Sequence, residues 1–346
     1  MRFLVFFGFL IAGLMAFGWS VLSSFNHFRD VERDFAGQCI PVNGLEGPED
    51  LQIDNARGRF FVSSRDRRDE QSRGAIHLFD IGDPLSDAGW RDRTGGVPEA
   101  FQPLGIHYFE NDEVRRLFVV NEANAGIELF DVLESGDLTH LETFRERRVT
   151  SPNDVVAVGP REFFVTNDVK PGRNNIVAPF LYLSRAGAGE LLYSDGTVWR
   201  VAVENLQFAN GVNASADGAM IYVAETSGNA VRIYDRNLET GRIQLKSTVS
   251  LDSAPDNINV DSAGMLWVGA MPKPLAVPRL ERDLDAIAPS QIVKIDPQTG
   301  VSTTIYKDSG DEISWSTAAA RDGSTLLIGS LFDKKFLICN LPPETR

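Results

Sequence analysis

Short segments carrying carboxylate and carboxamide side chains recur along this chain, each just before a β-like run. They are Gly47–Asp50, Ser151–Asp154, Phe208–Gly211 and Ala254–Asn257, and Phe101–Ile106 occupies the same kind of position without Asp, Glu or Asn. Ca²⁺ takes roughly six to eight oxygen ligands and tolerates irregular geometry, so oxygen donors from four distant segments suit one hard cation. The pattern therefore predicts a calcium site.

The spacing of these segments indicates a structural repeat. Equivalent positions fall at Pro48, Pro103, Pro152, Ala209, Pro255 and Trp315, at intervals of 55, 49, 57, 46 and 60 residues. Periods of about 40 to 50 residues with several short strands per unit are typical of propeller blades, which insertions lengthen. Six units predict an all-β, six-bladed β-propeller.

Strands that would position these segments are visible in each unit. One β-branched or aromatic run per unit comprises Arg59–Ser63, Arg116–Val120, Glu162–Thr166, Met220–Ala224, Met265–Gly269 and Thr325–Gly329. A further run follows in most units, at Ala75–Asp80, Gly126–Asp131, Ala230–Asp235 and Gln291–Asp296. Their alternation of apolar and polar residues fits strands packed between neighbouring blades and does not fit helices.

Composition and length are consistent with one closed ring. A chain of 346 residues is also long enough for two ordinary domains, but no Pro/Gly/Ser-rich linker or charge block divides it. The formal net charge of −14 argues against nucleic-acid binding, which needs a basic surface. Bound cations would neutralise part of this acidity.

The N-terminus predicts contact with a membrane. Phe3 to Leu22 is free of charge and follows Arg2, which favours a retained anchor with the body of the protein outside the cytoplasm. A cleaved signal peptide is the alternative, because Ala16-Phe17-Gly18 fits a cleavage site. We therefore expect a signal anchor or signal peptide with a juxtamembrane segment over residues 1–28 and the propeller over residues 29–346.

Two cysteines flank the point where the ring must close. Cys39 precedes the first blade and Cys339 ends the last predicted strand, so a disulfide between them would fasten the two ends of the ring. Two buried free thiols are the alternative. Export to an oxidising compartment favours the disulfide.

With these motifs in view, the chain resembles the serum paraoxonase/arylesterase family of six-bladed calcium propellers, from about Cys39 to Leu341. The resemblance implies two calcium ions, one catalytic at the channel floor and one structural and deeper. The motifs that match the catalytic site contribute Glu49, Asn153, Asn210, Asp256 and Asn257. The structural ion would be held by Asp50, Asp154 and the backbone carbonyl of Ile106, and the family's terminal disulfide matches Cys39 and Cys339.

The charges of the two ligand sets fit that assignment. Glu49 and Asp256 supply two carboxylates to the first set, and Asp50 and Asp154 supply two to the second, so each set balances one divalent cation. Without metal, each set would gather negative charge in a low-dielectric centre. Neither set contains His or Cys, which argues against zinc.

One departure from the family affects the mechanism. The family's histidine pair, discussed there as base and proton relay, falls at Leu104 and Glu122 in this chain. His107 is nearby, but its odd offset from Leu104 along a strand points it to the opposite face. It is either a substitute base or an ordinary strand histidine.

We therefore hypothesise hydrolysis of a small, hydrophobic lactone or aryl ester by a calcium-polarised carbonyl and calcium-bound water. Asp256 or Glu49 would act as base, and Asn153 and Asn210 would orient the carbonyl. Glu122 is a further candidate base. A purely ligating role for the carboxylates is the alternative.

Other features shape the competing functions. By resemblance, the long segments Lys170–Gly196 and Met271–Ser290 would form helices or lids over the channel mouth; the alternative is that they are plain exposed insertions. Ser316 and Thr317 either line the channel floor or serve only in packing. No Gly-x-Ser-x-Gly elbow or nucleotide motif is present. A gluconolactonase-like hydrolase and a non-catalytic, calcium-stabilised binding propeller remain alternatives, and a strictosidine-synthase-like condensing enzyme is a distant one.

Overall fold

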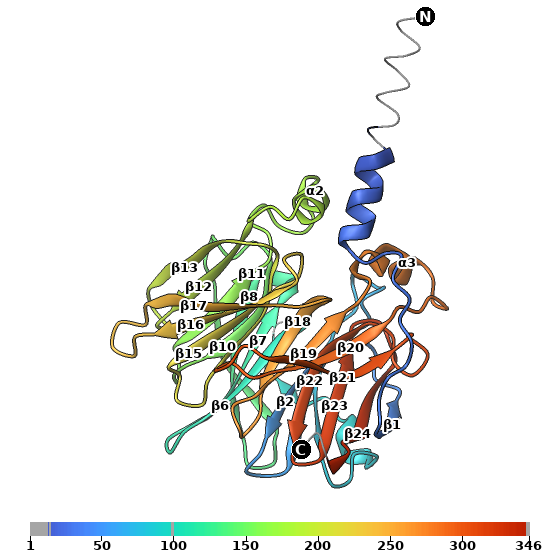
Figure 1. Ribbon diagram of the computed structural model, residues 1–346. Helices are drawn as coiled ribbons and strands as arrows, with labels where there is room; N and C mark the ends of the chain where they lie inside the picture. The colour runs from blue at the N-terminus through green and yellow to red at the C-terminus, as the bar shows by residue number, and fades with distance from the viewer. Residues whose placement is uncertain (1–12, 14, 98–99, 344–346) are drawn as a thin grey trace, which may run out of the picture.

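The computed structural model describes residues 13, 15–97 and 100–343, and within these residues the strands form six sheets around a common axis (Figure 1). The innermost strands of the six blades are β2 (Pro48–Asp54), β6 (Pro103–Glu110), β10 (Pro152–Ala157), β14 (Ala209–Ala214), β18 (Ala254–Val260) and β22 (Ser316–Asp322). They start within one residue of the repeat positions found in the sequence. The predicted six-bladed β-propeller is confirmed.

The blades form a closed ring. Each innermost strand contacts the innermost strand of the next blade, from β2 to β6 and onward to β22, which contacts β2 again. The second strands are β3 (Arg59–Ser64), β7 (Arg115–Asn121), β11 (Phe163–Asn167), β15 (Met220–Glu225), β19 (Leu266–Met271) and β23 (Thr325–Ser330). The third strands are β4 (Ala75–Asp80), β8 (Gly126–Val132), β12 (Gly189–Ser194), β16 (Ala230–Arg236), β20 (Ser290–Ile295) and β24 (Lys335–Asn340).

Outer strands complete most blades. They are β9 (Leu138–Phe144), β13 (Trp199–Leu206), β17 (Ile243–Ser250) and β21 (Ser302–Asp308), and the two-residue β5 (Thr94–Gly95) pairs in parallel with β9. The 3₁₀ turns η1 (Asp87–Trp90) and η2 (Glu122–Asn124) connect strands within the first two units. Sequence patterns missed most of these outer strands because they are half-exposed and carry a weaker apolar alternation.

The hydrophobic core lies between the blades, where aromatic side chains from one sheet meet those of the next. Phe60 and Phe79 of the first blade contact Phe336 of the last at centroid distances of 5.6 and 5.0 Å. Phe118 and Phe163 make the same contact between the second and third blades at 5.6 Å. Burial of these rings explains the β-branched and aromatic runs of the sequence.

The ring is closed by the N-terminal strand. β1 (Gln38–Asn43) pairs antiparallel with β24, so that the last blade combines both ends of the chain, and Cys39 lies opposite Cys339 in this register. The two residues form a disulfide across a sequence separation of 300. The predicted disulfide is confirmed, and the free-thiol alternative is wrong.

Every innermost strand carries a register irregularity against its neighbour. The shifts fall between Pro48 and Asp50, Pro103 and Ile106, Pro152 and Val155, Ala209 and Val212, Pro255 and Ile258, and Ser316 and Ala319. Such bulges redirect side chains and are frequent next to functional sites. The predicted metal ligands lie in or at the edge of these bulges.

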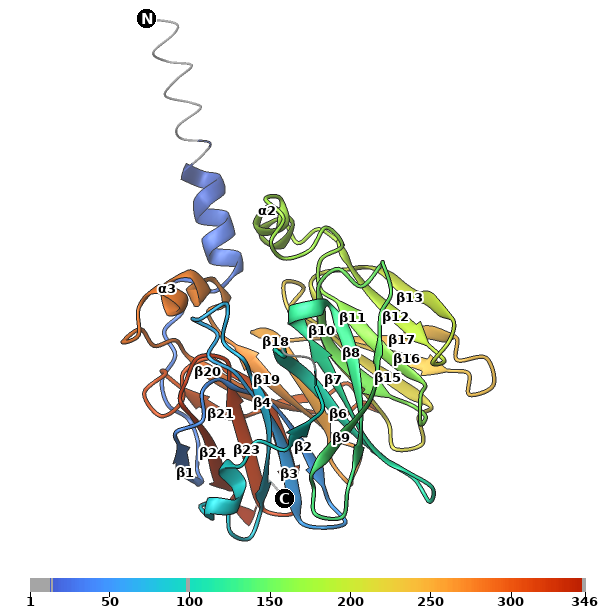
Figure 2. The same ribbon diagram turned by 180° about the vertical axis from the view of Figure 1, so that it is seen from behind.

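Helices gather at one end of the propeller. Helical residues 15–24, α2 (Ala178–Leu183) and α3 (Val277–Arg282), which follows the 3₁₀ turn η3 (Pro274–Ala276), lie at the same end in both views (Figures 1 and 2). Each of the two long segments predicted to form helices contains a short one, but Lys170–Gly196 also includes the blade strand β12, which the sequence pattern did not predict.

The chain that follows the first helix docks on this end of the propeller. Phe25 is fully buried and stacks on Tyr182 of α2 at a centroid distance of 5.5 Å. Asn26 Nδ2 donates to the carbonyl of Asp252 at 2.8 Å. Most of the predicted anchor, Phe3–Leu22, lies outside the described residues, and within the described part no helix is long and apolar enough to cross a membrane.

Candidate functional site

The bulges bring the predicted ligands of the catalytic ion to the axis of the ring. Glu49 comes from β2, Asn153 from β10, Asn210 from β14, and Asp256 and Asn257 from β18. All five side chains are buried although they are polar or charged. Four blades therefore supply oxygen-bearing groups to one region.

Four oxygens of this set have no hydrogen-bond partner among the described residues. They are Glu49 Oε2, Asn153 Oδ1, Asn210 Oδ1 and Asn257 Oδ1. Buried polar atoms are normally paired, since each unpaired one costs about 1–3 kcal/mol. In three of these residues the other polar atom is engaged: Asn257 Nδ2 donates to Glu49 Oε1 at 2.8 Å, and Asn210 Nδ2 donates to Thr226 Oγ1 at 2.9 Å.

Burying the ionised carboxylates of this region without a cation costs free energy. Burial raises the pKa of Glu49, partly offset by the nearby Arg67 guanidinium and the Asn257 amide. Burial, and next the charge of Glu49, raise the pKa of Asp256 well above its ordinary value. Two carboxylates and three amide oxygens in a buried space fit a hard, oxygen-binding cation such as Ca²⁺.

The predicted structural set is arranged differently. Asp50 accepts hydrogen bonds from the backbone nitrogens of Leu51 and Ile106, at 2.7 and 2.8 Å. Asp154 accepts from those of Val155 and Val212, both at 2.7 Å. Each carboxylate thus ties its own bulge to the next blade, while its oxygens keep further lone pairs for a cation.

Asp50 and Asp154 repel each other. Burial raises the pKa of both groups well above the ordinary value, and the largest electrostatic contribution to Asp50 comes from Glu49 and to Asp154 from Asp50. A bound cation would balance these buried carboxylates, which fits a second ion. The contact of Ile106 shown here is through its amide nitrogen.

Glycines permit the close approach of the bulges. A Cβ atom on Gly105 would collide with Asp154, and one on Gly211 would collide with the backbone of Asp256 and Asn257. Glycine is required where one backbone must approach another this closely. The sequence therefore encodes the convergence of blades two to five at the axis.

Within the described residues, no three His, Cys, Asp or Glu side chains gather as a metal-binding group on their own. The catalytic set depends instead on amide oxygens for three of its five predicted ligands. A calcium ion accepts such a mixed oxygen set, whereas zinc prefers His and Cys.

The two positions of the missing histidines have different environments. Leu104 is buried in the hydrophobic cluster that includes Phe118 and Val155. Glu122 is bound by the guanidinium groups of Arg65, Arg67 and Arg173.

Burial alone would raise the pKa of Glu122, but the three arginines outweigh it and lower the pKa. This carboxylate is ionised at neutral pH, yet its bound guanidiniums make it a poor proton acceptor. The structure therefore argues against Glu122 as the base.

His107 is an interior strand residue. Burial lowers its pKa to about 4, so the imidazole is neutral at pH 7. The backbone nitrogen of Ala157 in the neighbouring blade donates to His107 Nδ1 at 3.3 Å. This inter-blade contact fits the strand-histidine interpretation.

Ser316 and Thr317 support the floor through hydrogen bonds. Thr317 Oγ1 donates to the carbonyl of Glu49 at 2.7 Å. Ser316 Oγ accepts from the backbone nitrogen of Gln291 at 3.1 Å and donates to the carbonyl of Ala270 at 3.3 Å. Both hydroxyls act within the framework, as the packing interpretation expects.

Sequence reasoning missed the arginines at this site, whereas Tyr182 lies in Lys170–Gly196, which was expected to form helices or lids over the channel mouth. The charge-rich run Arg65–Arg68, placed directly after the second strand of the first blade, was the available signal. Tyr182 lies close enough to Asp256 for that carboxylate to contribute to the raised pKa of its hydroxyl, although burial is the larger cause. The ring of Tyr182 also contacts Phe208 at 5.1 Å, so α2 reaches the mouth of the site.

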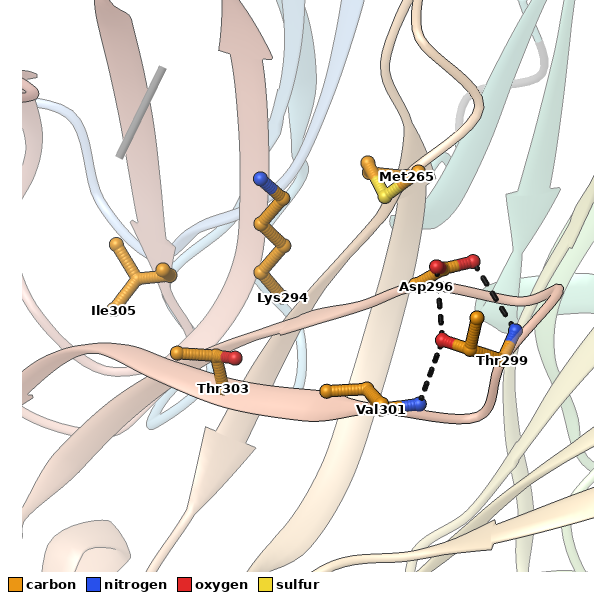
Figure 3. Close-up of a pocket in the computed structure, with 7 residues that line it drawn as sticks. All are labelled: Met265, Lys294, Asp296, Thr299, Val301, Thr303 and Ile305. Carbon is orange, nitrogen blue, oxygen red and sulfur yellow. Dashed lines mark hydrogen bonds between the residues drawn. The ribbon is translucent and has the colours of Figure 1, made fainter. Parts of the chain in front are cut away.

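A separate pocket lies on the outer edge of the fifth blade (Figure 3). Its polar contacts belong to the hairpin between β20 and β21, where Asp296 Oδ2 accepts from Thr299 Oγ1 at 2.8 Å. Lys294 and the apolar Met265 and Ile305 complete the lining. These contacts are those of a turn, and none of the predicted site residues lies there.

Comparison with known proteins identifies the family. A family model described as Arylesterase matches residues 68–341. The chain is 32% identical to serum paraoxonase/arylesterase 1 of Homo sapiens over 338 residues, covering 91% of this chain and 92% of that protein. It is 31% identical to serum paraoxonase/arylesterase 2 of Homo sapiens over 333 residues, covering 90% and 91%.

Solved structures agree on the fold. A gluconolactonase from Xanthomonas campestris superposes with a TM-score of 0.58 at 15% identity, covering 91% of this chain and 96% of its own. Regucalcin, a calcium-binding protein from Agrobacterium tumefaciens, superposes with a TM-score of 0.54 at 15% identity, covering 91% and 98%. On the strength of the family model and the sequence relatives, this chain belongs to the arylesterase family that includes the serum paraoxonases.

Proposed function

We propose that this protein is a calcium-dependent hydrolase of lactones or aryl esters that binds two Ca²⁺ ions. The observation that carries the proposal is the convergence of four unpartnered, buried oxygens from four blades on one axial region. Membership of the arylesterase family supports ester or lactone hydrolysis. The gluconolactonase and regucalcin likenesses support a propeller able to host such chemistry.

Bound Ca²⁺ supplies a Lewis acid that polarises a carbonyl and favours developing negative charge. Glu49, Asn153, Asn210, Asp256 and Asn257 would hold the catalytic ion, and Asp50 and Asp154, with the carbonyl of Ile106, the structural one. The residues of the chain hold the site in place, and all seven side chains that carry these oxygens are buried.

In the reaction, the oxygen of water forms a bond to the acyl carbon, the bond to the alcohol oxygen breaks, and one proton passes from the water to the leaving oxygen. Asp256 or Glu49 would accept and return that proton. Each of the two carboxylates has an amide beside it, since Glu49 Oε1 accepts from Asn257 at 2.8 Å and the amide of Asn210 interacts with Asp256. Asn153 and Asn210 would orient the carbonyl through their amide groups.

Hydrolysis assays with panels of lactones and aryl esters test this function, before and after chelation of calcium. We expect turnover that chelation abolishes and added calcium restores. Metal binding without turnover of any ester would contradict the proposal and favour the alternative of a non-catalytic binding propeller. That alternative has one specific observation in its favour, the replacement of the family's histidine pair by Leu104 and Glu122.

We also propose that the N-terminal segment holds the protein at a membrane outside the cytoplasm. The apolar side chains of Phe17, Trp19, Ile176 and Phe180 are exposed at the end of the propeller where the helices gather. The disulfide suits an oxidising compartment. Recovery of the full chain in the soluble fraction, identical to that of a variant without residues 1–28, would contradict this placement.

A further inference from the structure

Three arginine side chains converge on one carboxylate beside the candidate metal site. Arg65 Nη1 lies 3.2 Å from Glu122 Oε2, and Arg67 and Arg173 also form ion pairs with Glu122. Arg173 pairs in addition with Asp168, which is buried. We call Arg65, Arg67, Arg173, Glu122 and Asp168 the arginine cluster.

The cluster lies next to the candidate catalytic residues. Arg67 Nη2 donates to the carbonyl of Pro103 at 2.8 Å, and Arg173 Nη2 donates to that of Pro152 at 3.1 Å. These prolines immediately precede Leu104, where the family has a histidine, and Asn153, a predicted calcium ligand. The arginine cluster therefore rests on the starts of β6 and β10, at the edge of the axial site.

Solvent reaches the cluster. The side chain of Arg173 is 33% exposed and that of Glu122 is 18% exposed, whereas those of Arg65 and Arg67 are almost buried. Solvent can therefore reach Arg173 and Glu122 more readily than the buried carboxylates of Glu49 and Asp256.

Within its ion pairs the cluster has one positive charge in excess, although Glu49 lies near enough to Arg67 and Arg173, and Asp69 near enough to Arg65, to interact with them as well. Its three guanidiniums outnumber the two carboxylates of Glu122 and Asp168 by one. Arg65 makes one ion pair, with Glu122, and its Nε donates to Ser72 Oγ at 3.3 Å. Among the described residues, Arg65 Nη2 makes no hydrogen bond, and burial, followed by the charge of Arg67, lowers the pKa of Arg65.

We propose that the arginine cluster binds a carboxylate of the substrate, so that the preferred substrate is a lactone or ester bearing one negative charge. This deepens the proposed function and rests on it for the reaction itself. The planar guanidinium fork matches carboxylate geometry, and such charge-assisted hydrogen bonds are strong in a poorly solvated site. One surplus positive charge matches a carboxylate better than a phosphate, which carries about −1.5 to −2 at neutral pH.

Binding of a non-hydrolysable pair of probes tests the proposal without turnover. Titration calorimetry of the full chain in calcium-containing buffer compares 4-phenylbutyrate with the neutral 4-phenylbutyramide. We expect the carboxylate to bind at least about tenfold more tightly, a difference of about 1.4 kcal/mol. Equal binding of the two probes overturns the proposal.

Variants locate the effect. Arg65→Gln removes one of three partners of Glu122, so the fold should survive, as thermal unfolding will show, and the tenfold preference should be lost. Arg65→Lys should keep part of it. Arg161→Gln, which breaks an exposed pair with Glu142 elsewhere, is the matched control and should keep all of it. A preference that persists in Arg65→Gln places the carboxylate on other groups, such as the metal, and overturns the proposal.

Two further experiments test the charge of the preferred ligand and the turnover of anionic esters. Tighter binding of 3-phenylpropyl phosphate than of 4-phenylbutyrate contradicts the match to a single charge. Monophenyl glutarate and phenyl acetate then compare turnover, where we expect kcat/KM to favour the anionic ester in the wild type and the ratio to fall about tenfold in Arg65→Gln. If neither ester is hydrolysed while the calorimetric pattern holds, the proposed hydrolase function fails and the carboxylate site stands.

Discussion

Asn257 Nδ2 donates to Glu49 Oε1 at 2.8 Å, which joins the fifth blade to the first across 208 residues of sequence. The bond fixes the orientation of both groups, so that Glu49 Oε2 and Asn257 Oδ1 are left without partners inside the protein. An amide that donates to a carboxylate keeps its own oxygen available. The pair is therefore preorganised for a cation, because little rearrangement is needed to present both oxygens.

Asn210→Ala is the first test of that cation site. The substitution removes an unpartnered oxygen and one hydrogen bond to Thr226. We expect calcium affinity and ester hydrolysis to fall together, each by about tenfold or more, while the fold is retained. Calcium titration followed by calorimetry, beside the activity assay, measures both. Unchanged activity would show that Asn210 is outside the site.

Asn213→Ala in the same strand is the matched control. Asn213 Nδ2 donates to the carbonyl of Ile258, and its Oδ1 accepts from the nitrogen of Ala214, so its amide is already satisfied. Loss of these bonds should cost about 1–3 kcal/mol of stability with little change in calcium affinity. The two variants therefore give opposite patterns if the unpartnered oxygen is the relevant feature.

Removal of calcium should destabilise the fold in a pH-dependent way. In the metal-free protein the pKa values of Asp50, Asp154 and Asp256 are raised, first by burial and then by neighbouring carboxylates. A raised folded-state pKa means that the stabilising contribution is complete below the unfolded pKa and is lost as pH rises through the folded pKa. The chelated protein should therefore unfold more easily at about pH 8 than at about pH 5.

Added calcium should reverse this trend, since binding requires ionised carboxylates. At a free concentration of 100 times Kd, each site adds about 2.7 kcal/mol. Thermal unfolding with and without chelator, at both pH values, measures the effect. A chelator effect that is absent, or that is larger at the acidic pH, would contradict the assignment of these carboxylates as calcium ligands.

The fold was predictable because each blade repeats the same sequence motif followed by short β-strands. The six inner strands begin at or beside Pro48, Pro103, Pro152, Ala209, Pro255 and Trp315, so one repeated motif defines both blade number and axis. Outer strands such as β13 and β17 were not, because their residues are half-exposed and their apolar pattern is weak. The cysteines predicted that the two ends of the chain meet, but the pairing of β1 with β24 was not predicted.

The site was predictable only in part, for a physical reason. Oxygen donors such as Glu49 and Asp256 occur in recurrent motifs, but their partners are brought in by tertiary packing. Arg173 belongs to a long insertion with no periodic pattern, and nothing local indicates that its side chain meets Glu122. Charge pairing across blades is set by the geometry of the ring, which a sequence pattern does not encode.

The disulfide should support stability much more than turnover. It closes a separation of 300 residues, for which the chain-entropy model gives an upper bound of roughly 5–6 kcal/mol. The double variant Cys39→Ala and Cys339→Ala keeps the β1–β24 pairing and leaves no odd thiol. We expect a clear loss in thermal unfolding temperature with activity at moderate temperature retained. Equal stability of variant and wild type would show that the strand pairing alone closes the ring.

A buried carboxylate in the second blade should make stability sensitive to acid. Glu128 is fully buried and accepts hydrogen bonds from Asn121 and Asn124 on Oε1, at 2.8 and 3.0 Å. Its Oε2 is bonded to Thr143 and to His140 Nε2, the latter at 2.8 Å. Burial would raise the pKa of Glu128, but these hydrogen bonds outweigh it and lower the pKa.

Glu128→Gln should therefore lower the free energy of unfolding by about 1–3 kcal/mol at neutral pH, because an amide nitrogen cannot accept these donors. A lowered folded-state pKa means that the stabilisation is present above the unfolded pKa and is lost as pH falls through the folded pKa. The difference between wild type and variant should thus shrink below about pH 4 in denaturant unfolding. Glu142→Gln, which affects only the exposed pair with Arg161, should change stability by less than about 1 kcal/mol at any pH. A wild type and Glu128→Gln variant that differ equally at both ends of the pH range would show that the network acts through packing and not through the charge of the carboxylate.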